Sequence, residues 1–342
     1  MRESLLYEHA GNDDGTVICN LCAHRCRIAS GEYGICGVRE NSGKMLHTHV
    51  YGRAIAERAD PIEKKPLYHF LPSSATYSIA ALGCNFKCDF CQNWSISQMR
   101  GLRSADMDTQ GAATPPKTII ECALKQKCQS VSFTYTEPTV FFEYALDTAK
   151  LAKDAKLKTI FVSNGYMTPE CLKMVAPYLS ACNIDLKSFC DDFYREHCGA
   201  SLKPVLESLK MIREMGVWLE VTTLVITDVN DSDKELGDIA GFIADELGAD
   251  VPWHVSKFYP QYRMGNHPAT AIASIERAVQ AGVRAGLKYV YAGNVDFAQN
   301  TLCPSCRSAV IRRCGYTAEV CGLDVEAGTC QKCGAKISGI FY

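Results

Sequence analysis

The sequence has no long hydrophobic run and no excess of charge of one sign. Its 342 residues hold 36 Lys and Arg against 38 Asp and Glu, so the net charge is −2. That balance excludes a broad basic face as the main device for holding nucleic acid. The longest apolar stretches fall far short of the ~20 residues that a membrane-spanning helix needs. We therefore expect neither a nucleic-acid partner nor a membrane partner.

Other common features are also missing. Residues Met1 to Ser4 contain no apolar segment of the kind that directs secretion. We find no low-complexity linker and no internal repeat. Hydrophobic residues at 47% and charged residues at 22% are ordinary for a folded globular chain, which excludes a disordered one.

Cysteine, in contrast, is abundant. The chain has 19 cysteines, an odd number, and many of them stand two or three residues apart. That spacing is too close for easy disulfide pairing but suits a shared metal. We therefore expect a reducing, cytoplasmic compartment and cysteines that bind metal or iron–sulfur clusters. Four isolated cysteines are expected to be small buried hydrophobic residues: Cys122, Cys128, Cys171 and Cys198.

The cysteine pattern divides the chain into three regions. Residues 1–75 and 299–342 are rich in cysteine, whereas residues 76–298 alternate short apolar runs with amphipathic segments. Alternating strands and helices predict an α/β fold with crossover connections and a parallel sheet. We predict a partial (β/α)6 barrel with two small metal-binding additions, although periodicity alone does not separate a barrel from a doubly wound sheet. The predicted strands are 77–82, 130–135, 158–163, 181–186, 218–226, 252–258 and 288–291. The clearest helical patterns are 118–127, 140–152 and 236–247, the last with Asp231 or Ser232 as its N-cap.

The central cysteines follow the first predicted strand. Cys84, Cys88 and Cys91 form the pattern C-x3-C-x2-C, at a place where a barrel carries its functional loops. Iron–sulfur clusters are usually held by four cysteines, so three thiolates suit a [4Fe–4S] cluster with one iron left without a protein ligand. An open position marks a metal centre that does chemistry. The alternative is a structural zinc site with a distant fourth ligand.

The same loop carries a family resemblance. With Phe90 before its third cysteine, the motif resembles the signature of the radical S-adenosylmethionine (radical SAM) superfamily. Three longer strings, Asp60–Phe70, Gly83–Phe86 and Cys91–Trp94, resemble the radical SAM enzyme of the AmmeMemoRadiSam system, a family often labelled pyruvate-formate-lyase-activating-enzyme-like. This likeness extends over nearly the whole chain.

The resemblance implies two cofactors, a [4Fe–4S] cluster and S-adenosylmethionine (SAM). In the superfamily the open iron is chelated by the amino and carboxylate groups of SAM. One electron from the reduced cluster then cleaves SAM to methionine and a 5′-deoxyadenosyl radical, which abstracts a hydrogen atom from the substrate. A low-potential electron donor is implied as a partner. The substrate is either a protein, by analogy with the activation of glycyl-radical enzymes, or a small molecule.

The resemblance also suggests residues that bind SAM. Glu137 stands where relatives carry a Gly-Gly-Glu motif for the SAM amino group, although this chain has Tyr135-Thr136 in place of the glycines. Asn164 resembles the family's Asn-Gly turn. Asp185 and Lys187 alternate on one face of a strand end and could meet the SAM carboxylate or ribose. Each has a structural alternative: a helix-start carboxylate for Glu137, the turn itself for Asn164, and an ion pair for Asp185 with Lys187.

Four more residues are candidates at the SAM site. Phe90 is expected to pack beside the adenine, or only within the cluster loop. His254 lies in a family-like Pro-Trp-His string, although a lone His is more often a satisfied core residue. Tyr291 and Asn294 stand at the last strand of the barrel and are expected to cover the adenosyl end of SAM.

The outer cysteines form two complete sets of metal ligands. Four thiols are the full complement for zinc or for a cluster, and ligand type alone hardly separates the two. In the N-terminal set we favour a structural metal, with His24 as a spare ligand. In the C-terminal set two C-x2-C pairs predict a zinc-ribbon or rubredoxin-like knuckle, with zinc favoured over iron. The sets are Cys19, Cys22, Cys26 and Cys36, and Cys303, Cys306, Cys330 and Cys333.

Together these patterns predict a radical SAM oxidoreductase. Two alternatives remain open at this point. A non-catalytic iron–sulfur electron carrier needs neither an open iron nor polar residues at the strand ends. A zinc-dependent binding module needs only the outer cysteines.

Overall fold

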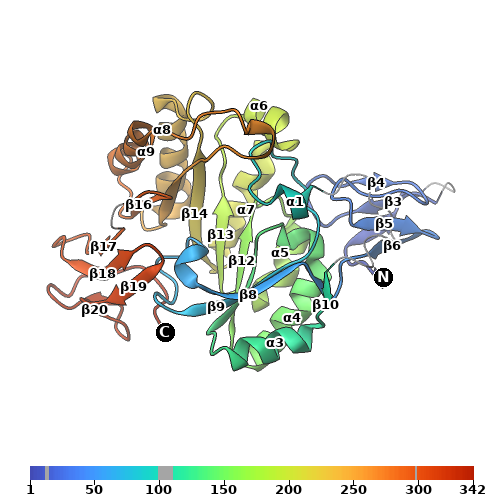
Figure 1. The fold of residues 1–342 in the computed structure, drawn as a ribbon, viewed down its shortest axis with the longest axis horizontal. Coiled ribbons are helices and arrows are strands. Elements are labelled where there is room, and N and C mark those ends of the chain that lie inside the picture. The colour runs from blue at the N-terminus through green and yellow to red at the C-terminus, as the bar shows by residue number, and fades with distance from the viewer. Residues whose placement is uncertain (12–14, 99–110, 297–298) are drawn as a thin grey trace.

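The computed structural model describes residues 1–11, 15–98, 111–296 and 299–342. Its centre is an eight-stranded sheet in the order β16-β15-β14-β13-β12-β11-β9-β8 (Figure 1). All neighbours pair in parallel except β8 (Ala56–Pro61), which is antiparallel to β9. The sheet stays open between β8 and β16, so the predicted α/β partial barrel is confirmed. Its parallel strands are β9 (Ala75–Ala80), β11 (Ser130–Phe133), β12 (Lys158–Ser163), β13 (Ala181–Asp185), β14 (Trp218–Val225), β15 (Trp253–Lys257) and β16 (Val290–Gly293).

Helices connect the successive parallel strands and flank the sheet in Figure 1. Thr168 caps α5 by accepting a hydrogen bond from the Cys171 N–H at 3.2 Å. Ser232 caps α8 in the same way, and it is one of the two N-caps that the sequence predicted. The longer helices are α3 (Pro116–Lys125), α4 (Phe142–Asp154), α5 (Pro169–Val175), α7 (Leu202–Glu214), α8 (Asp233–Phe242) and α9 (Ile272–Arg284). The short ones are η1 (Ile62–Lys64), α1 (Trp94–Ser97), η2 (Pro138–Phe141), η3 (Ala176–Tyr178), α6 (Asp191–Phe193), η4 (Tyr194–Cys198), η5 (Ile243–Gly248) and η6 (Tyr262–Met264).

Two predicted strands are shifted along the chain. The run expected at 77–82 begins two residues earlier as β9, and the run expected at 288–291 is found two residues later as β16. Periodicity marks which residues are apolar, but pairing with the neighbouring strands decides where a strand ends. The second shift matters for the site, because it places Tyr291 inside the strand and not at its end.

The central strands are buried on both faces. All four residues of β11 are buried, as expected for a parallel strand covered by helices on one side and by other chain segments on the other. Phe133 and Phe161 on neighbouring strands are fully buried, with ring centroids 5.5 Å apart. Burial of each such ring contributes roughly 1.5–3 kcal/mol, so this core fixes the sheet that carries the site.

The two cysteine-rich regions form small sheets at opposite ends of the molecule in Figure 1. The division at residues 75 and 298 stays a prediction, and β8 lies before residue 75 although it belongs to the central sheet. The N-terminal strands are β1 (Arg2–Glu3), β2 (Tyr7–His9), β3 (Val17–Cys19), β4 (Arg27–Ile28), β5 (Arg39–Ser42) and β6 (Met45–Thr48), followed by the pair β7 (Arg53–Ala54) and β10 (Ala112–Ala113). The C-terminal strands are β17 (Thr301–Leu302), β18 (Ala309–Cys314), β19 (Thr317–Val320), β20 (Leu323–Asp324) and β21 (Thr329–Cys330).

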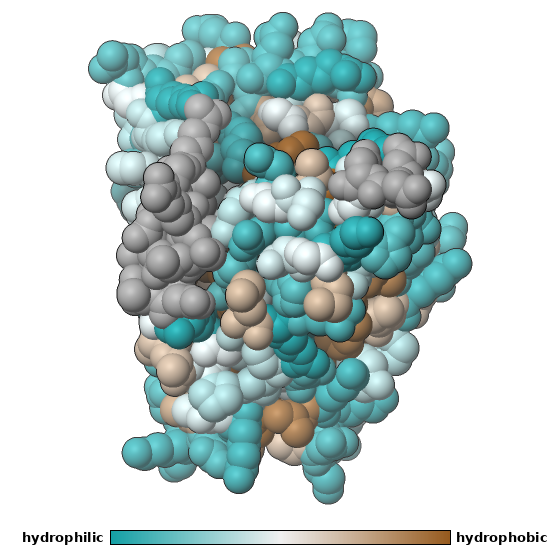
Figure 2. Space-filling model, turned by 90° about the vertical axis from the view of Figure 1, so that its right-hand side faces the viewer, coloured by the Kyte–Doolittle hydropathy of each residue, from teal (hydrophilic) through white to brown (hydrophobic). Residues whose placement is uncertain are grey.

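The outer surface on the N-terminal side is mostly hydrophilic, with hydrophobic residues in small scattered groups (Figure 2). Among the described residues, none of the helices has the length and hydrophobicity that crossing a bilayer requires.

Gly83 fixes the start of the central cysteine loop against the N-terminal region. Its φ is +93°, and a Cβ there would lie 2.7 Å from Val38 Cγ1 and 2.9 Å from the Cys36 carbonyl oxygen.

We predict that Gly83→Ala lowers the free energy of unfolding by roughly 1–3 kcal/mol, because the side chain adds both strain and a clash. Thermal unfolding measures this. Gly237→Ala is the control, since Gly237 has open space in α8 and alanine there favours the helix. An unchanged melting temperature for Gly83→Ala would contradict the prediction.

Candidate functional site

A cavity of about 850 Å³ opens at the carboxyl ends of the parallel strands. Such strands bring these ends to the same edge, so segments far apart in the sequence meet there. The volume lies in the upper part of the ~300–1,000 Å³ range of small-molecule sites. Ten of the residues predicted from the sequence line this cavity: Cys84, Cys88, Phe90, Cys91, Glu137, Asn164, Asp185, Lys187, His254 and Asn294.

The cysteine loop is held by the polypeptide around it. The Cys84 sulfur accepts the Phe86 N–H at 3.3 Å, and the Cys91 sulfur lies 3.2 Å from Ser97 Oγ. Burial raises the pKa of the Cys84 and Cys91 thiols. Free thiols there stay protonated at neutral pH, and metal binding must release their protons.

The three thiols fit a [4Fe–4S] cluster better than one zinc ion. Thiolates on a single zinc at ~2.3 Å lie only ~3.8 Å apart, because the ligands form a tetrahedron. Among the described residues, Cys84, Cys88 and Cys91 do not gather their sulfurs within 4.8 Å of one another. In a cluster each thiolate binds a different iron, so wider spacing is required. No fourth cysteine is among the residues that line the cavity, which leaves the fourth iron to another ligand.

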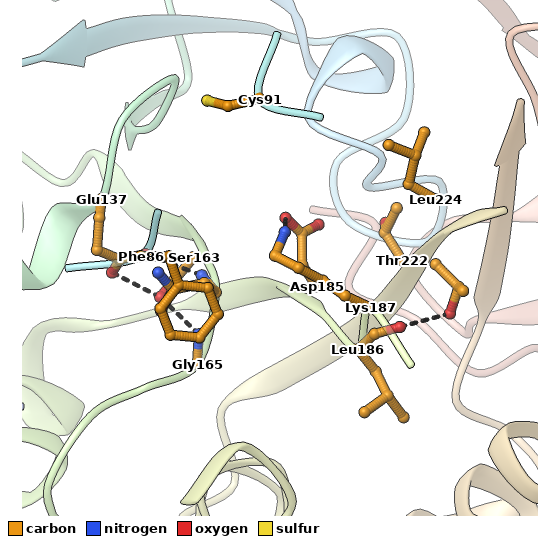
Figure 3. A network of polar contacts seen from close by, with 12 residues as sticks. Phe86, Cys91, Glu137, Ser163, Gly165, Asp185, Leu186, Lys187, Thr222 and Leu224 are labelled. Atoms are coloured by element: carbon orange, nitrogen blue, oxygen red, sulfur yellow. Dashed lines mark hydrogen bonds and ion pairs between the residues drawn. The ribbon is translucent and has the colours of Figure 1, made fainter. Parts of the chain in front are cut away.

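Glu137 stands at the cavity wall and also organises the chain behind it (Figure 3). Its Oε1 accepts hydrogen bonds from Thr139 N and Oγ1 at 3.0 and 2.6 Å and from Ser163 Oγ at 2.8 Å. Its Oε2 accepts the Asn164 N–H at 2.9 Å. The helix-start alternative is therefore present in the structure, since Glu137 caps η2. Oε2 keeps a second acceptor position for a ligand. Burial raises the pKa of this carboxyl.

Asn164 connects the turn after β12 to the cysteine loop. Its Nδ2 donates to Asn85 Oδ1 at 2.8 Å and lies 3.8 Å from the Cys84 sulfur, and its Oδ1 accepts the Tyr166 N–H at 3.0 Å. The next residue, Gly165, has φ +72°, and a Cβ there would lie 2.8 Å from Ile184. The turn that the sequence analysis offered as the alternative to a contact with SAM is therefore present at Asn164 and Gly165.

Asp185 and Lys187 form the ion pair that the sequence offered as an alternative. Lys187 Nζ lies 2.7 Å from Asp185 Oδ2, and both side chains face the cavity (Figure 3). Burial lowers the pKa of Lys187, but Asp185 and the nearby thiols of Cys88 and Cys198 raise it more, so the net shift is upward. The ammonium of Lys187 is therefore retained next to the cysteine loop, also 5.9 Å from the Phe90 ring.

Three predicted residues on or just after β15 and β16 differ in their position relative to the cavity. His254 lines the cavity, but its Nε2 is bonded to Glu220 Oε2 at 2.7 Å, so it is a satisfied core histidine as well. Asn294 lines the cavity with φ +58°. Tyr291 does not line it: its hydroxyl bonds His69 Nε2 at 2.6 Å and Thr301 Oγ1 at 2.8 Å. The prediction for Tyr291 needs this correction because β16 continues to Gly293 and leaves Tyr291 deeper in the sheet.

Sequence reasoning missed the buried carboxylate of Glu220 on β14. This residue accepts the backbone N–H groups of Tyr68 and His69 at 2.9 and 2.8 Å, in addition to His254. Burial raises its pKa, but the hydrogen bond and charge of His254 outweigh this and lower it. Glu220 thereby holds the segment after η1 against the barrel. A charged residue in the middle of an apolar strand was the signal that could have found it.

Lys65 lines the cavity and was not singled out from the sequence either. Its Nζ lies 2.8 Å from Asp60 Oδ2 and 4.4 Å from the Tyr135 ring centroid, and the Tyr135 hydroxyl also bonds Asp60. Burial lowers the pKa of Lys65 to about 8. The string Asp60–Phe70 marked the segment, but only the fold shows that it borders the site.

The C-terminal cysteines gather their four sulfurs where a single metal ion could bind. The sulfurs of Cys303 and Cys333 are 3.6 Å apart and those of Cys306 and Cys330 are 3.7 Å apart. All four lie within 4.8 Å of one another, close to the spacing of thiolates around one tetrahedral ion. The predicted C-terminal cysteine group is thus confirmed as a set that could hold a metal ion.

Comparisons with known proteins agree with this geometry. A family model of the radical SAM superfamily matches residues 79–240. The uncharacterized protein MJ0808 of Methanocaldococcus jannaschii is 41% identical over 339 residues, covering 98% of this chain and 99% of that protein. A second protein of that organism, the uncharacterized protein MJ0674, is 25% identical over 287 residues, covering 80% and 76%. The structure of Streptococcus suis SuiB bound to S-adenosylmethionine aligns with a TM-score of 0.50 at 14% identity, covering 68% of this chain and 53% of SuiB, and so shares the fold.

The chain belongs to the radical SAM superfamily, and within it to the family of MJ0808. Its expected cofactors are therefore those of the superfamily, a [4Fe–4S] cluster and SAM. The narrower resemblance to the AmmeMemoRadiSam enzyme remains a prediction.

A fourth thiol lies beside the central set. A hydrogen bond with Cys198, together with burial, raises the pKa of Cys88. Cys198 is fully buried and does not line the cavity, so its thiol packs behind Cys88. Burial was also predicted correctly for Cys128 and Cys171, whereas Cys122 is only partly buried.

We predict that Cys198→Ala keeps the iron content of the reconstituted protein close to the wild-type value, since this thiol is packing and not a ligand. Cys88→Ala is the matched control and should lose the cavity cluster. Iron analysis of both variants decides the matter, and an equal loss of iron in Cys198→Ala would make Cys198 a fourth ligand.

Proposed function

We propose that the protein is a radical SAM enzyme that cleaves SAM reductively and uses the resulting 5′-deoxyadenosyl radical to abstract hydrogen from a substrate. The observation that supports this most directly is the set of three thiols on the wall of a cavity at the barrel mouth, without a fourth cysteine among its lining residues. When bound there, the cluster supplies the electron for the cleavage.

The residues of the cavity have separate tasks in this proposal. Cys84, Cys88 and Cys91 hold the cluster, and the free acceptor position of Glu137 Oε2 receives the ammonium group of SAM. The ammonium of Lys187 lies where it can meet the SAM carboxylate, while its pairing with Asp185 holds it in place. The remaining predicted lining residues, Phe90, Asn164, His254 and Asn294, shape the adenosine end and exclude water.

The rim of the cavity favours a protein substrate over a free small molecule. Tyr259 and Tyr316 line the opening although they are 48% and 52% exposed. Exposed aromatic side chains are enriched where proteins bind other proteins. A protein substrate would agree with the proposed likeness to enzymes that activate glycyl-radical proteins, and a low-potential donor would supply the electron.

We predict that the anaerobically reconstituted protein, given dithionite and SAM, releases 5′-deoxyadenosine. Single Cys84→Ala, Cys88→Ala and Cys91→Ala variants should give none, because each removes a cluster ligand. Chromatography of the quenched reaction measures the product. A non-catalytic electron carrier or a zinc-binding module gives no product in the wild type, and persistent cleavage in the cysteine variants would overturn the site.

We predict that Glu137→Gln raises the Kd for SAM roughly ten- to hundredfold, since a charge-assisted hydrogen bond contributes ~1.5–3 kcal/mol. The iron content should not change. Glu121→Gln on the exposed side of α3 is the control. Equilibrium binding of SAM to the cluster-loaded variants tests this, and an unchanged Kd would remove Glu137 from the SAM site.

A further inference from the structure

The N-terminal cysteines surround a cavity of their own, separate from the one at the barrel mouth. Its wall contains all four thiols of the N-terminal set, Cys19, Cys22, Cys26 and Cys36. The remaining lining is mostly apolar and includes Leu21, Ile28 and Val140. The thiols therefore face a common space that little water can enter.

The spacing of these thiols differs from that of the C-terminal set. Only the C-terminal cysteines, among the described residues, gather three or more ligand atoms within 4.8 Å. No three of the N-terminal sulfurs therefore lie within 4.8 Å of one another, whereas thiolates around one zinc ion lie ~3.8 Å apart. In this respect they resemble the central thiols Cys84, Cys88 and Cys91, which fit a cluster. The protein thus contains one set of cysteines spaced for a single metal ion and two sets whose sulfurs are spaced more widely.

A buried cation adds a second, independent observation. Arg39 also lines this cavity and is only 1% exposed. Its Nη2 donates to Glu143 Oε2 at 2.5 Å, but Nε and Nη1 have no hydrogen-bond partner within the described chain. Unsatisfied donors on a buried charge are costly. They indicate that the cavity takes an anionic occupant. Thiolates bound to a metal centre are anionic, whereas neutral thiols are not.

The spare ligand His24 also lines this cavity and connects it to the central cysteine loop. Its Nε2 is bonded to the backbone carbonyl of Asn85 at 2.8 Å, within the loop that carries the central cysteines. Four thiols are by themselves the full complement for a cluster, and His24 joins the N-terminal region directly to the loop of the first cluster.

We propose that Cys19, Cys22, Cys26 and Cys36 bind a second [4Fe–4S] cluster, fully ligated by protein and stabilised by Arg39. The wide spacing of the thiols indicates several metal ions, and Arg39 indicates that the thiols are ionised. This replaces the structural metal expected from the sequence and leaves zinc to the C-terminal set.

Iron and zinc counts on the full chain test the proposal. We predict about eight irons and one zinc per wild-type chain after anaerobic reconstitution. A Cys84→Ala, Cys88→Ala, Cys91→Ala triple variant should keep about four irons, with the visible absorption and reduced-state EPR signal of a [4Fe–4S] cluster. Cys22→Ser with Cys26→Ser, which changes the two partly exposed thiols of the set, should also keep about four irons and still bind SAM at the central cluster.

The outcomes separate this proposal from the proposed function. A triple variant with no iron and two zinc ions per chain would overturn the second cluster, whatever the wild-type enzyme does with SAM. Failure of SAM cleavage in a wild type with eight irons would affect only the proposed function. Circular dichroism of each variant shows whether it is folded.

The role of Arg39 has its own measurement in the triple variant. Replacing the ion pair by Arg39→Met with Glu143→Gln removes the positive charge without leaving a buried carboxylate. The reduction potential of the remaining cluster should become more negative, because the reduced form carries one more negative charge. An unchanged potential would show that Arg39 does not face the cluster.

Discussion

The parallel register of the seven central strands is the constraint on which the site depends. Each strand delivers its carboxyl end to the same edge, so Cys84, Glu137, Asn164 and Asp185 meet there although they span about a hundred residues of sequence. The apolar core under this edge is buried on both faces of the sheet. The loops can therefore vary in sequence while the edge that holds them keeps its shape.

Buried polar groups connect the two cysteine-rich regions to the edge of the central sheet that carries the site. Glu220 on β14 binds the backbone of Tyr68 and His69, and Arg313 from the C-terminal region donates to the Tyr68 carbonyl at 2.5 Å. At the other end, His24 bonds the Asn85 carbonyl. Each contact satisfies a buried group that would otherwise be costly, so both cysteine-rich regions are connected to the barrel through its functional rim.

The three cysteine sets differ in geometry as well as in position. The C-terminal sulfurs are packed to single-metal spacing, whereas the central and N-terminal sulfurs stand around cavities. Ligand type is the same in all three sets, and thiolates suit zinc and iron alike. The three sets therefore differ in the spacing of their sulfurs and in the charges around them, not in the type of ligand.

The sequence by itself determined the cysteine sets, the alternation of strands and helices, and the residues that follow each strand. These are local properties: a motif of close cysteines and the period of apolar residues are both read along the chain. They were sufficient for the α/β class and, together with the family resemblance, for ten of the residues at the cavity. The resemblance carried by the Cys84–Cys91 loop supplied the superfamily.

Only the tertiary structure decided which of these residues share a space. Tyr291 was expected at the site, but pairing with β15 extends β16 to Gly293 and turns its hydroxyl toward His69. Glu220 and Arg39 were not singled out, because their partners lie far away in sequence. Lys65 was missed because the sequence around it does not show that this segment borders the cavity. Burial, the meeting of distant segments and the spacing of thiols depend on packing in three dimensions, which a pattern along one dimension does not contain.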